Sequence, residues 1–230
     1  MASVHGWDLS PQQAFVVQSK LAAQVERQPR LGQVRRLAGI DVSVRGEVAR
    51  AAVVVLELEG LAPVDYAIAV RPVTFPYVPG LLAFREGPVV LDALALLGTP
   101  PDLLIFDGQG LAHPRRLGIA SHMGVLTDLP SVGCAKSRLC GQYEEPGQEP
   151  GSHTPLVDRG EVVGAVLRTR PGVTPVYVSI GHRVDLETSL RYVLTACRGH
   201  RLPETTRWAH RVAGGEVPPL QARQARLFDL

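Results

Sequence analysis

A short apolar segment that runs directly into a carboxylate constrains the fold of this chain more than any other feature. Residues 103–106 read LLIF and are followed at once by Asp107 and a glycine-rich turn, residues 107–110 (DGQG). So short an apolar run beside a glycine-rich turn predicts a fully buried strand. An aspartate at the end of a buried strand is costly unless a cation meets it. We therefore expect a charged site at Asp107.

The segments after Asp107 complete a strand, loop, helix and strand. The loop carries residues 113–116 (HPRR), a helix is predicted over about residues 117–127, and a second apolar run leads into residues 133–136 (GCAK). Polar groups therefore follow two strands at their carboxyl ends. Open α/β sheets bind ligands at that edge.

The rest of the chain continues an α/β pattern. Three early strands with short turns between them predict an antiparallel meander. The strands are expected at residues 37–44, 50–57, 64–73, 103–106, the run into 133–136, 161–168 and 176–180. The helices are expected at residues 10–27, 81–97 with a break or restart at Pro88, 117–127, 185–198 and 202–212.

Two segments read as irregular. Residues 142–155 are rich in Gly, Pro, Glu and Ser and predict a surface loop, and residues 216–230 predict a loosely ordered tail. With 230 residues, of which 45% are hydrophobic, we expect residues 1–230 to form a single domain. The net charge of +2 excludes a polycation. No signal pattern and no apolar run of about 18 residues is visible, so we expect a cytoplasmic monomer without membrane contact.

Three acidic residues are candidates for one site: Asp41 within the first strand, Glu86 near a helix start, and Asp107. Cys and His do not show zinc-ligand spacing. A set of carboxylates prefers a hard cation such as Mg²⁺ or Mn²⁺, which can activate water for attack on phosphate. The plainer alternatives remain open, since Asp41 can cap a turn and Arg85 and Glu86 can form a solvated ion pair.

The segment between the third strand and the next helix has a stiff aromatic tip. Pro76 and Pro79 restrict the backbone around Tyr77 and Val78. Such a tip can pack on the core, or it can act as a wedge that inserts between stacked bases.

These residues together resemble the endonuclease V (deoxyinosine 3′ endonuclease) family. The matching blocks are residues 39–43 (GIDVS), 76–86 (PYVPGLLAFRE), 107–110 (DGQG), 113–115 (HPR), 133–137 (GCAKS), 178–182 (VSIGH) and 207–210 (RWAH). Each block is short, but their order and spacing span about residues 37–210 and make the likeness specific.

The resemblance implies a ribonuclease H-like α/β fold, with a mixed five-stranded central sheet, an antiparallel first trio and helices on both faces. It implies a Mg²⁺-dependent DNA repair endonuclease, in which Mn²⁺ can substitute. Such an enzyme nicks the second phosphodiester bond 3′ to deoxyinosine and leaves 3′-hydroxyl and 5′-phosphate ends.

The resemblance also implies residue roles. Asp41 and Asp107 would hold the metal, Glu86 would complete the set directly or through water, Lys136 would lie near the scissile phosphate, and His210 would help hold metal or water. Tyr77, with Pro76, Val78 and Pro79, would be the DNA wedge. The pocket for hypoxanthine would involve Gly80, Leu82, Gly108 and Gly133, and His113 would contact DNA or support the pocket.

Three other functions stay open at this stage. The chain could bind inosine or mismatches without cleaving, or it could be an inosine-specific endoribonuclease, because inosine also occurs in RNA. A sugar-kinase-type phosphotransferase also begins with an aspartate-bearing strand and a meander, but such folds generally need two lobes.

Overall fold

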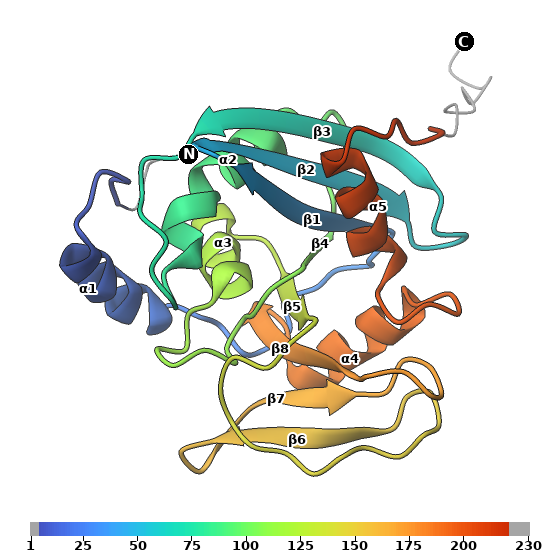
Figure 1. Ribbon diagram of the computed structural model, residues 1–230. Coiled ribbons are helices and arrows are strands. Elements are labelled where there is room, and N and C mark those ends of the chain that lie inside the picture. The colour runs from blue at the N-terminus through green and yellow to red at the C-terminus, as the bar shows by residue number, and fades with distance from the viewer. Residues whose placement is uncertain (1–4, 221–230) are drawn as a thin grey trace.

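One mixed sheet runs through the part of the chain that the computed structural model describes, residues 5–220 (Figure 1). Its strands lie in the order β3-β2-β1-β4-β5-β8-β7-β6. The strands are β1 (Arg36–Arg45), β2 (Val48–Glu57), β3 (Pro63–Pro72), β4 (Leu103–Phe106), β5 (Ser131–Ala135), β6 (His153–Asp158), β7 (Glu161–Leu167) and β8 (Val176–His182). β1 pairs with β4, and β4 with β5, in parallel, whereas every other neighbouring pair is antiparallel.

Helices cover both faces of this sheet, as expected. They are α1 (Pro11–Ala22), α2 (Leu82–Ala95), α3 (Ile119–Thr127), α4 (Leu186–Thr195) and α5 (Glu204–Ala213). Leu103 and Ile105 of β4 pack on the face that carries α4 and α5, and Leu104 and Phe106 pack on the face that carries α2 and α3. The alternation of side chains along a strand therefore explains why LLIF is buried on both sides.

The expected five-stranded sheet is not confirmed, because the sheet within the described residues has eight strands. The antiparallel trio β1, β2 and β3 is confirmed. β6 lies at one edge, partly inside residues 142–155, which the composition had predicted to be a loop. Of its side chains only Leu156 is buried. An edge strand with so little apolar surface gives a weak signal in the sequence.

Two helix predictions are refined. Ser10 caps α1 through a reciprocal bond with Gln13, and Pro11 begins the helix, as the sequence indicates. The break expected at Pro88 does not occur, because α2 continues through it. Ala83, Phe84, Val89 and Val90 are buried on both sides of the proline, and this packing holds the helix together despite the lost N–H.

A glycine sets how closely α5 approaches the sheet. A Cβ atom placed on Gly39 of β1 would lie 2.0 Å from the carbonyl oxygen of Thr205 in α5. Only a residue without a side chain allows this contact. α5 carries His210, so Gly39 helps to position that histidine.

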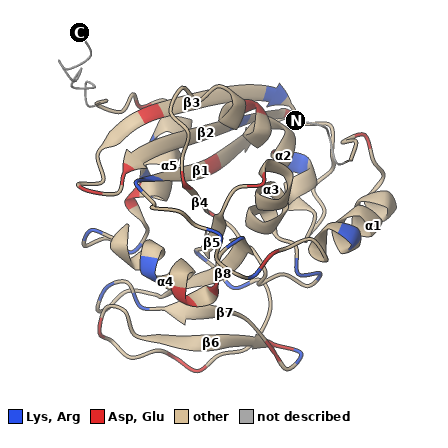
Figure 2. Ribbon diagram, turned by 180° about the vertical axis from the view of Figure 1, so that it is seen from behind, with Lys and Arg blue, Asp and Glu red and all other residues tan. Residues whose placement is uncertain are grey.

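Residues 215–220 follow α5 without regular structure, and the remainder of the predicted tail, 221–230, lies outside the described residues. Acidic and basic positions are interspersed over the fold (Figure 2). Within residues 5–220, no helix has the length and apolar character that crossing a bilayer requires.

Candidate active site

Asp41 and Asp107 are brought together by the parallel pairing of β1 and β4. The last paired residues are Ile40 and Phe106, so the two aspartates follow at equivalent positions. The Asp107 N–H donates to the Ile40 carbonyl at 3.3 Å and continues the pairing by one bond. Both side chains are mostly shielded from solvent, each with 15% of its surface exposed.

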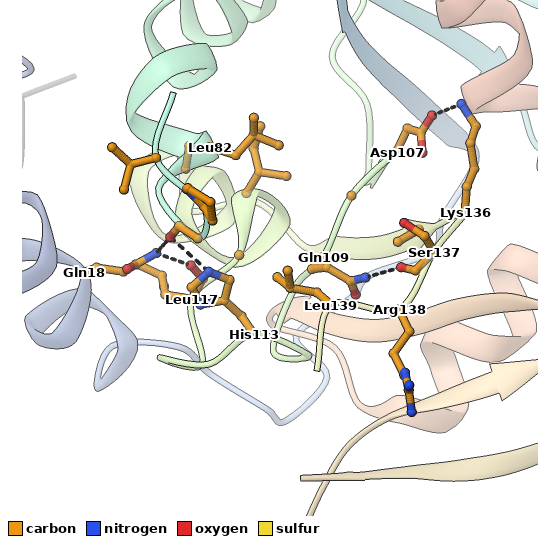
Figure 3. Close-up of a pocket in the computed structure, with 18 of the residues that line it drawn as sticks. Gln18, Leu82, Asp107, Gln109, His113, Leu117, Lys136, Ser137, Arg138 and Leu139 are labelled. Carbon is orange, nitrogen blue, oxygen red and sulfur yellow. Dashed lines mark hydrogen bonds and ion pairs between the residues drawn. The ribbon is translucent and has the colours of Figure 1, made fainter. Parts of the chain in front are cut away.

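Each aspartate has a basic partner. Lys136, the residue directly after β5, forms an ion pair with Asp107 (Figure 3). His210 of α5 places its Nδ1 3.0 Å from Oδ2 of Asp41. Burial raises the pKa of Asp41, the hydrogen bond from His210 lowers it, and the charge of Asp107 raises it again. The net pKa of Asp41 is above its ordinary value of 3.8.

Glu86 enters from the other layer, in the second turn of α2. Burial is the main cause that raises its pKa to about 8, and the negative charges of Asp41 and Asp107 add to the increase. Arg85 acts in the opposite direction. The charges of Asp41 and Asp107 raise the pKa of Glu86 only if Glu86 lies near both of them. The three acids predicted from separate motifs therefore share one electrostatic neighbourhood.

The carboxylates of Asp41, Glu86 and Asp107 are not gathered around a single ion position in this structure. Among the described residues, no three Asp, Glu, His or Cys side chains are gathered closely enough to hold a metal ion as they stand. Instead, the Asp107 carboxylate is paired with Lys136, and the Asp41 carboxylate is bonded to His210. The three carboxylates supply oxygen donors, which are the ligands that a hard divalent cation prefers.

The proline-bounded loop combines an anchored base with an exposed tip. Phe75 is buried against Phe84, and Arg85 Nη1 donates to the Phe75 carbonyl at 2.7 Å. Tyr77, between the two prolines, leaves 72% of its side chain in solvent. The base of this loop therefore packs on the core, which was one of the two predicted alternatives. The exposed aromatic tip remains a candidate for the wedge.

A pocket of about 390 Å³ lies between this loop and the acidic edge (Figure 3). Of the predicted pocket residues, Gly80, Leu82, Gly108 and His113 line it. Gly133 does not, because it is buried beneath the turn, where an added Cβ would lie 2.4 Å from the Gly110 nitrogen. Gly133 therefore allows β5 to pack against the turn that follows Asp107.

His113 supports the pocket wall. Its Nδ1 accepts from the Arg115 N–H at 3.1 Å, so the proton of the neutral ring is on Nε2, which donates to the Gly80 carbonyl at 3.0 Å. Burial lowers the His113 pKa to about 4, so the ring is neutral at pH 7. Gly80 has a φ of +80°, which glycine adopts without strain.

Gln18 is a site residue that the sequence analysis missed. Its Nε2 donates to the carbonyls of Gly80 at 2.9 Å and Leu117 at 2.8 Å, and its Oε1 accepts from Arg115. Gln18 is 1% exposed and shares the buried face of α1 with Ala14 and Leu21. A lone polar residue on an apolar helix face was the signal that could have revealed it.

Comparisons with known proteins agree with one another. The family model described as Endonuclease V matches residues 19–211. Endonuclease V of Roseiflexus sp. strain RS-1 is 57% identical over 213 residues, which cover 92% of this chain and 96% of the relative. The crystal structure of Endonuclease V from Streptomyces avermitilis superposes with a TM-score of 0.87 at 46% identity, covering 91% of this chain and 93% of that one.

A third relative was solved with nucleic acid. Endonuclease V of Ciona intestinalis, in complex with a 24-mer DNA containing an inosine followed by a ribo-adenosine, has a TM-score of 0.76 at 26% identity. That match covers 88% of this chain and 95% of the other. The relatives place the chain among the nucleases, a class of hydrolase. The chain belongs to the endonuclease V family.

Proposed function

We propose that this chain is a divalent-metal-dependent DNA repair endonuclease that recognises deoxyinosine. It cuts the second phosphodiester bond 3′ to the lesion and leaves a 3′-hydroxyl and a 5′-phosphate. The observation that carries the proposal is the common neighbourhood of Asp41, Glu86 and Asp107 beside a pocket and an exposed tyrosine. The relative solved with inosine-containing DNA supports the choice of substrate.

The acidic set fits a hard divalent cation. Burial is the main cause that raises the pKa values of Asp41 and Glu86, and repulsion between the carboxylates adds to it. A bound cation would stabilise the charged carboxylates against both effects. Asp41 and Asp107 would hold the ion, and Glu86 would join them directly or through water. A bound Mg²⁺ or Mn²⁺ supplies polarisation of the phosphate and a more acidic water.

The basic residues act on the phosphate and on protons. In the hydrolysis a water oxygen loses a proton and forms a bond to phosphorus, the bond from phosphorus to the 3′-oxygen breaks, and the 3′-oxygen takes up a proton. Lys136, beside Asp107, provides a fixed positive charge for the phosphate. His210 is bonded through Nδ1 to Asp41, which leaves its exposed Nε2 able to hold a water or transfer a proton.

The loop and the pocket explain lesion recognition. Tyr77, braced by Pro76 and Pro79, would enter the stack and separate the bases. Hypoxanthine pairs poorly, so extruding it costs less than extruding a normal base. Main-chain groups of Gly80, Leu82 and Gly108 would then meet the edge of the base in the pocket. His113 would act through Gly80 and not through a DNA contact of its own.

We also infer that β3-β2-β1-β4-β5 is a ribonuclease H-like core, to which β8, β7 and β6 are an extension. The support is the antiparallel trio followed by two parallel strands, with an acid on β1 and another directly after β4.

RNA is the second candidate substrate. The ribo-adenosine that follows the inosine in the substrate of the Ciona intestinalis relative makes an inosine-specific endoribonuclease a specific alternative. The two functions differ in whether a 2′-hydroxyl next to the lesion is tolerated or required.

The experiment compares four end-labelled duplexes of one sequence: inosine in DNA, inosine in DNA with one following ribonucleotide, inosine in RNA, and adenine in DNA. Each is incubated with Mg²⁺, with Mn²⁺ or with EDTA, and the product ends are mapped. We expect a metal-dependent nick of inosine DNA directly after the nucleotide that follows the inosine, at the second phosphodiester bond on its 3′ side. If only the RNA is cleaved, the chain is an inosine-specific endoribonuclease and the proposed function is wrong. If inosine DNA is bound without any nick, the chain is a binding protein.

A further inference from the structure

Three exposed apolar side chains surround the pocket without belonging to the core. Tyr77, Leu82 and Leu139 all line it, and none belongs to the apolar clusters of the described residues. Tyr77 and Leu82 come from the wedge loop and the start of α2. Leu139 comes from a different segment, residues 136–141 after β5, and leaves 46% of its surface exposed. Figure 3 draws it among the residues that line the pocket.

The segment that carries Leu139 is held firmly. Gln109 Nε2 donates to the Ser137 carbonyl at 2.9 Å, and Arg201 Nη2 donates to the Lys136 carbonyl at 2.7 Å. Arg138 Nη1 donates to the Gly141 carbonyl at 2.9 Å. Fixing the backbone on both sides of Leu139 without burying its side chain presents an apolar group to the pocket. Its neighbour Cys140, by contrast, packs against the core.

The charges beside Leu139 suit a polyanion. Lys136 and Arg138 precede it in the same segment, and both are exposed. Arg138 forms no ion pair with any carboxylate in residues 5–220. Its Nη1 donates to the Gly141 carbonyl and its guanidinium lies over the Tyr143 ring, which leaves further N–H groups for a phosphate. An apolar side chain near two cations at a pocket suits a nucleotide, which combines a flat ring with a negatively charged backbone.

We propose that Leu139 is a specificity-determining residue that packs against the extruded base from a segment separate from the Tyr77 wedge loop. This proposal rests on the proposed function and adds a contact to it. Leu139 packs on the ring once the base has entered, and Arg138 holds the adjoining phosphate. Since the contact requires an extruded base, it strengthens binding of lesion DNA more than binding of undamaged DNA.

The test uses Leu139→Ala, with Leu139→Met as the conservative variant and Leu96→Ala as the matched control. Leu96 is also an exposed leucine, at 64%, but it lies at the far end of α2 and does not line the pocket. Affinities are measured in EDTA, by fluorescence anisotropy, for an inosine duplex and its adenine counterpart. Thermal unfolding of each variant checks the fold.

We expect Leu139→Ala to weaken inosine binding by roughly 10-fold or more, since one missing methylene in an apolar pocket is worth about 10- to 200-fold, and to leave adenine binding unchanged. Leu139→Met restores most of the affinity, and Leu96→Ala equals the wild type. An unchanged inosine affinity, or equal losses on both duplexes, overturns the role of Leu139. If the wild-type chain itself does not prefer inosine, the proposed function fails together with this inference.

Discussion

Asp41 and Asp107 stand one residue beyond the paired ends Ile40 and Phe106 of two parallel strands, and the Asp107 N–H still bonds to the strand that carries Asp41. Two residues 66 positions apart in the sequence (107 − 41) are thus fixed side by side by backbone pairing. The geometry does not depend on any loop, so either side chain can be changed without moving the other.

Replacing either aspartate by asparagine is therefore expected to abolish cleavage and to preserve the fold. Asn keeps the shape but removes the negative charge that a divalent ion needs. We expect nicking of inosine DNA in Mg²⁺ to fall at least about a thousandfold, or ~4 kcal/mol, in Asp41→Asn and in Asp107→Asn. Circular dichroism and thermal unfolding serve as the control. More than a tenth of wild-type activity in either variant would refute the assignment.

Glu86 predicts an unusual dependence of stability on pH. Its pKa is about 8 in the folded chain, above the ordinary 4.5. The folded state therefore retains a proton that the unfolded state has lost, and the free energy of unfolding falls as the pH rises from about 4.5 to 8. Glu86→Gln removes this penalty, and we expect it to stabilise the metal-free protein at pH 9 by on the order of 2–4 kcal/mol.

Urea unfolding of wild type and Glu86→Gln at pH 5, 7 and 9, in EDTA, measures this effect. The two curves should nearly coincide at pH 5, where the Glu86 carboxyl is protonated, and separate as the pH rises. A constant difference across the range would show that the Glu86 pKa is not raised.

Gly39 is expected to control the position of His210 from beneath α5. In Gly39→Ala the new methyl group meets the Thr205 carbonyl and pushes the helix outward. We expect a loss of stability of about 1–3 kcal/mol and a further loss of activity in the protein that remains folded. Gly32→Ala is the matched control, because a Cβ at Gly32 meets nothing within 4 Å. Equal behaviour of the two variants would contradict the close contact.

Gln18 is expected to shape the pocket by holding the Gly80 carbonyl, without taking part in the reaction itself. Gln18→Leu keeps the volume but removes donors from the Gly80 and Leu117 carbonyls and leaves Arg115 Nε without its acceptor. Buried groups that lose their partners cost about 1–3 kcal/mol of stability. Gln12→Leu, on the exposed side of the same helix, is the control. Denaturation measures the loss of stability. Steady-state kinetics measure the effect on the pocket, and we expect KM to rise by a larger factor than kcat falls.

Tyr77 is expected to matter for duplex DNA and not for folding. Tyr77→Ala removes a side chain that is mostly in solvent, so the melting temperature should stay within about 1 °C of the wild type. Cleavage of an inosine duplex should fall by at least tenfold, or ~1.4 kcal/mol, because strand separation loses its stacking partner. An inosine single strand, already unpaired, should lose much less, and Tyr77→Phe should keep both activities. Equal losses on both substrates would contradict the wedge.

The sequence by itself determined both ends of β4 and the polar chemistry that follows it. The apolar run before Asp107, the strand around Asp41 and the prolines around Tyr77 are local patterns, and local patterns are set by the nearest residues. Recognisable blocks in the sequence also indicated the family. The glycines at 39 and 80 were visible in the sequence, but their partners were not.

Only the tertiary structure decided which distant groups meet. β6 carries too few apolar residues to predict a strand, and it forms because β7 offers an open edge. The polar contacts of Gln18, the burial of Gly133 beneath the turn and the presentation of Leu139 to the pocket depend on packing between segments far apart in the chain. Such packing is settled by the shape of the whole core, which no short window of sequence contains.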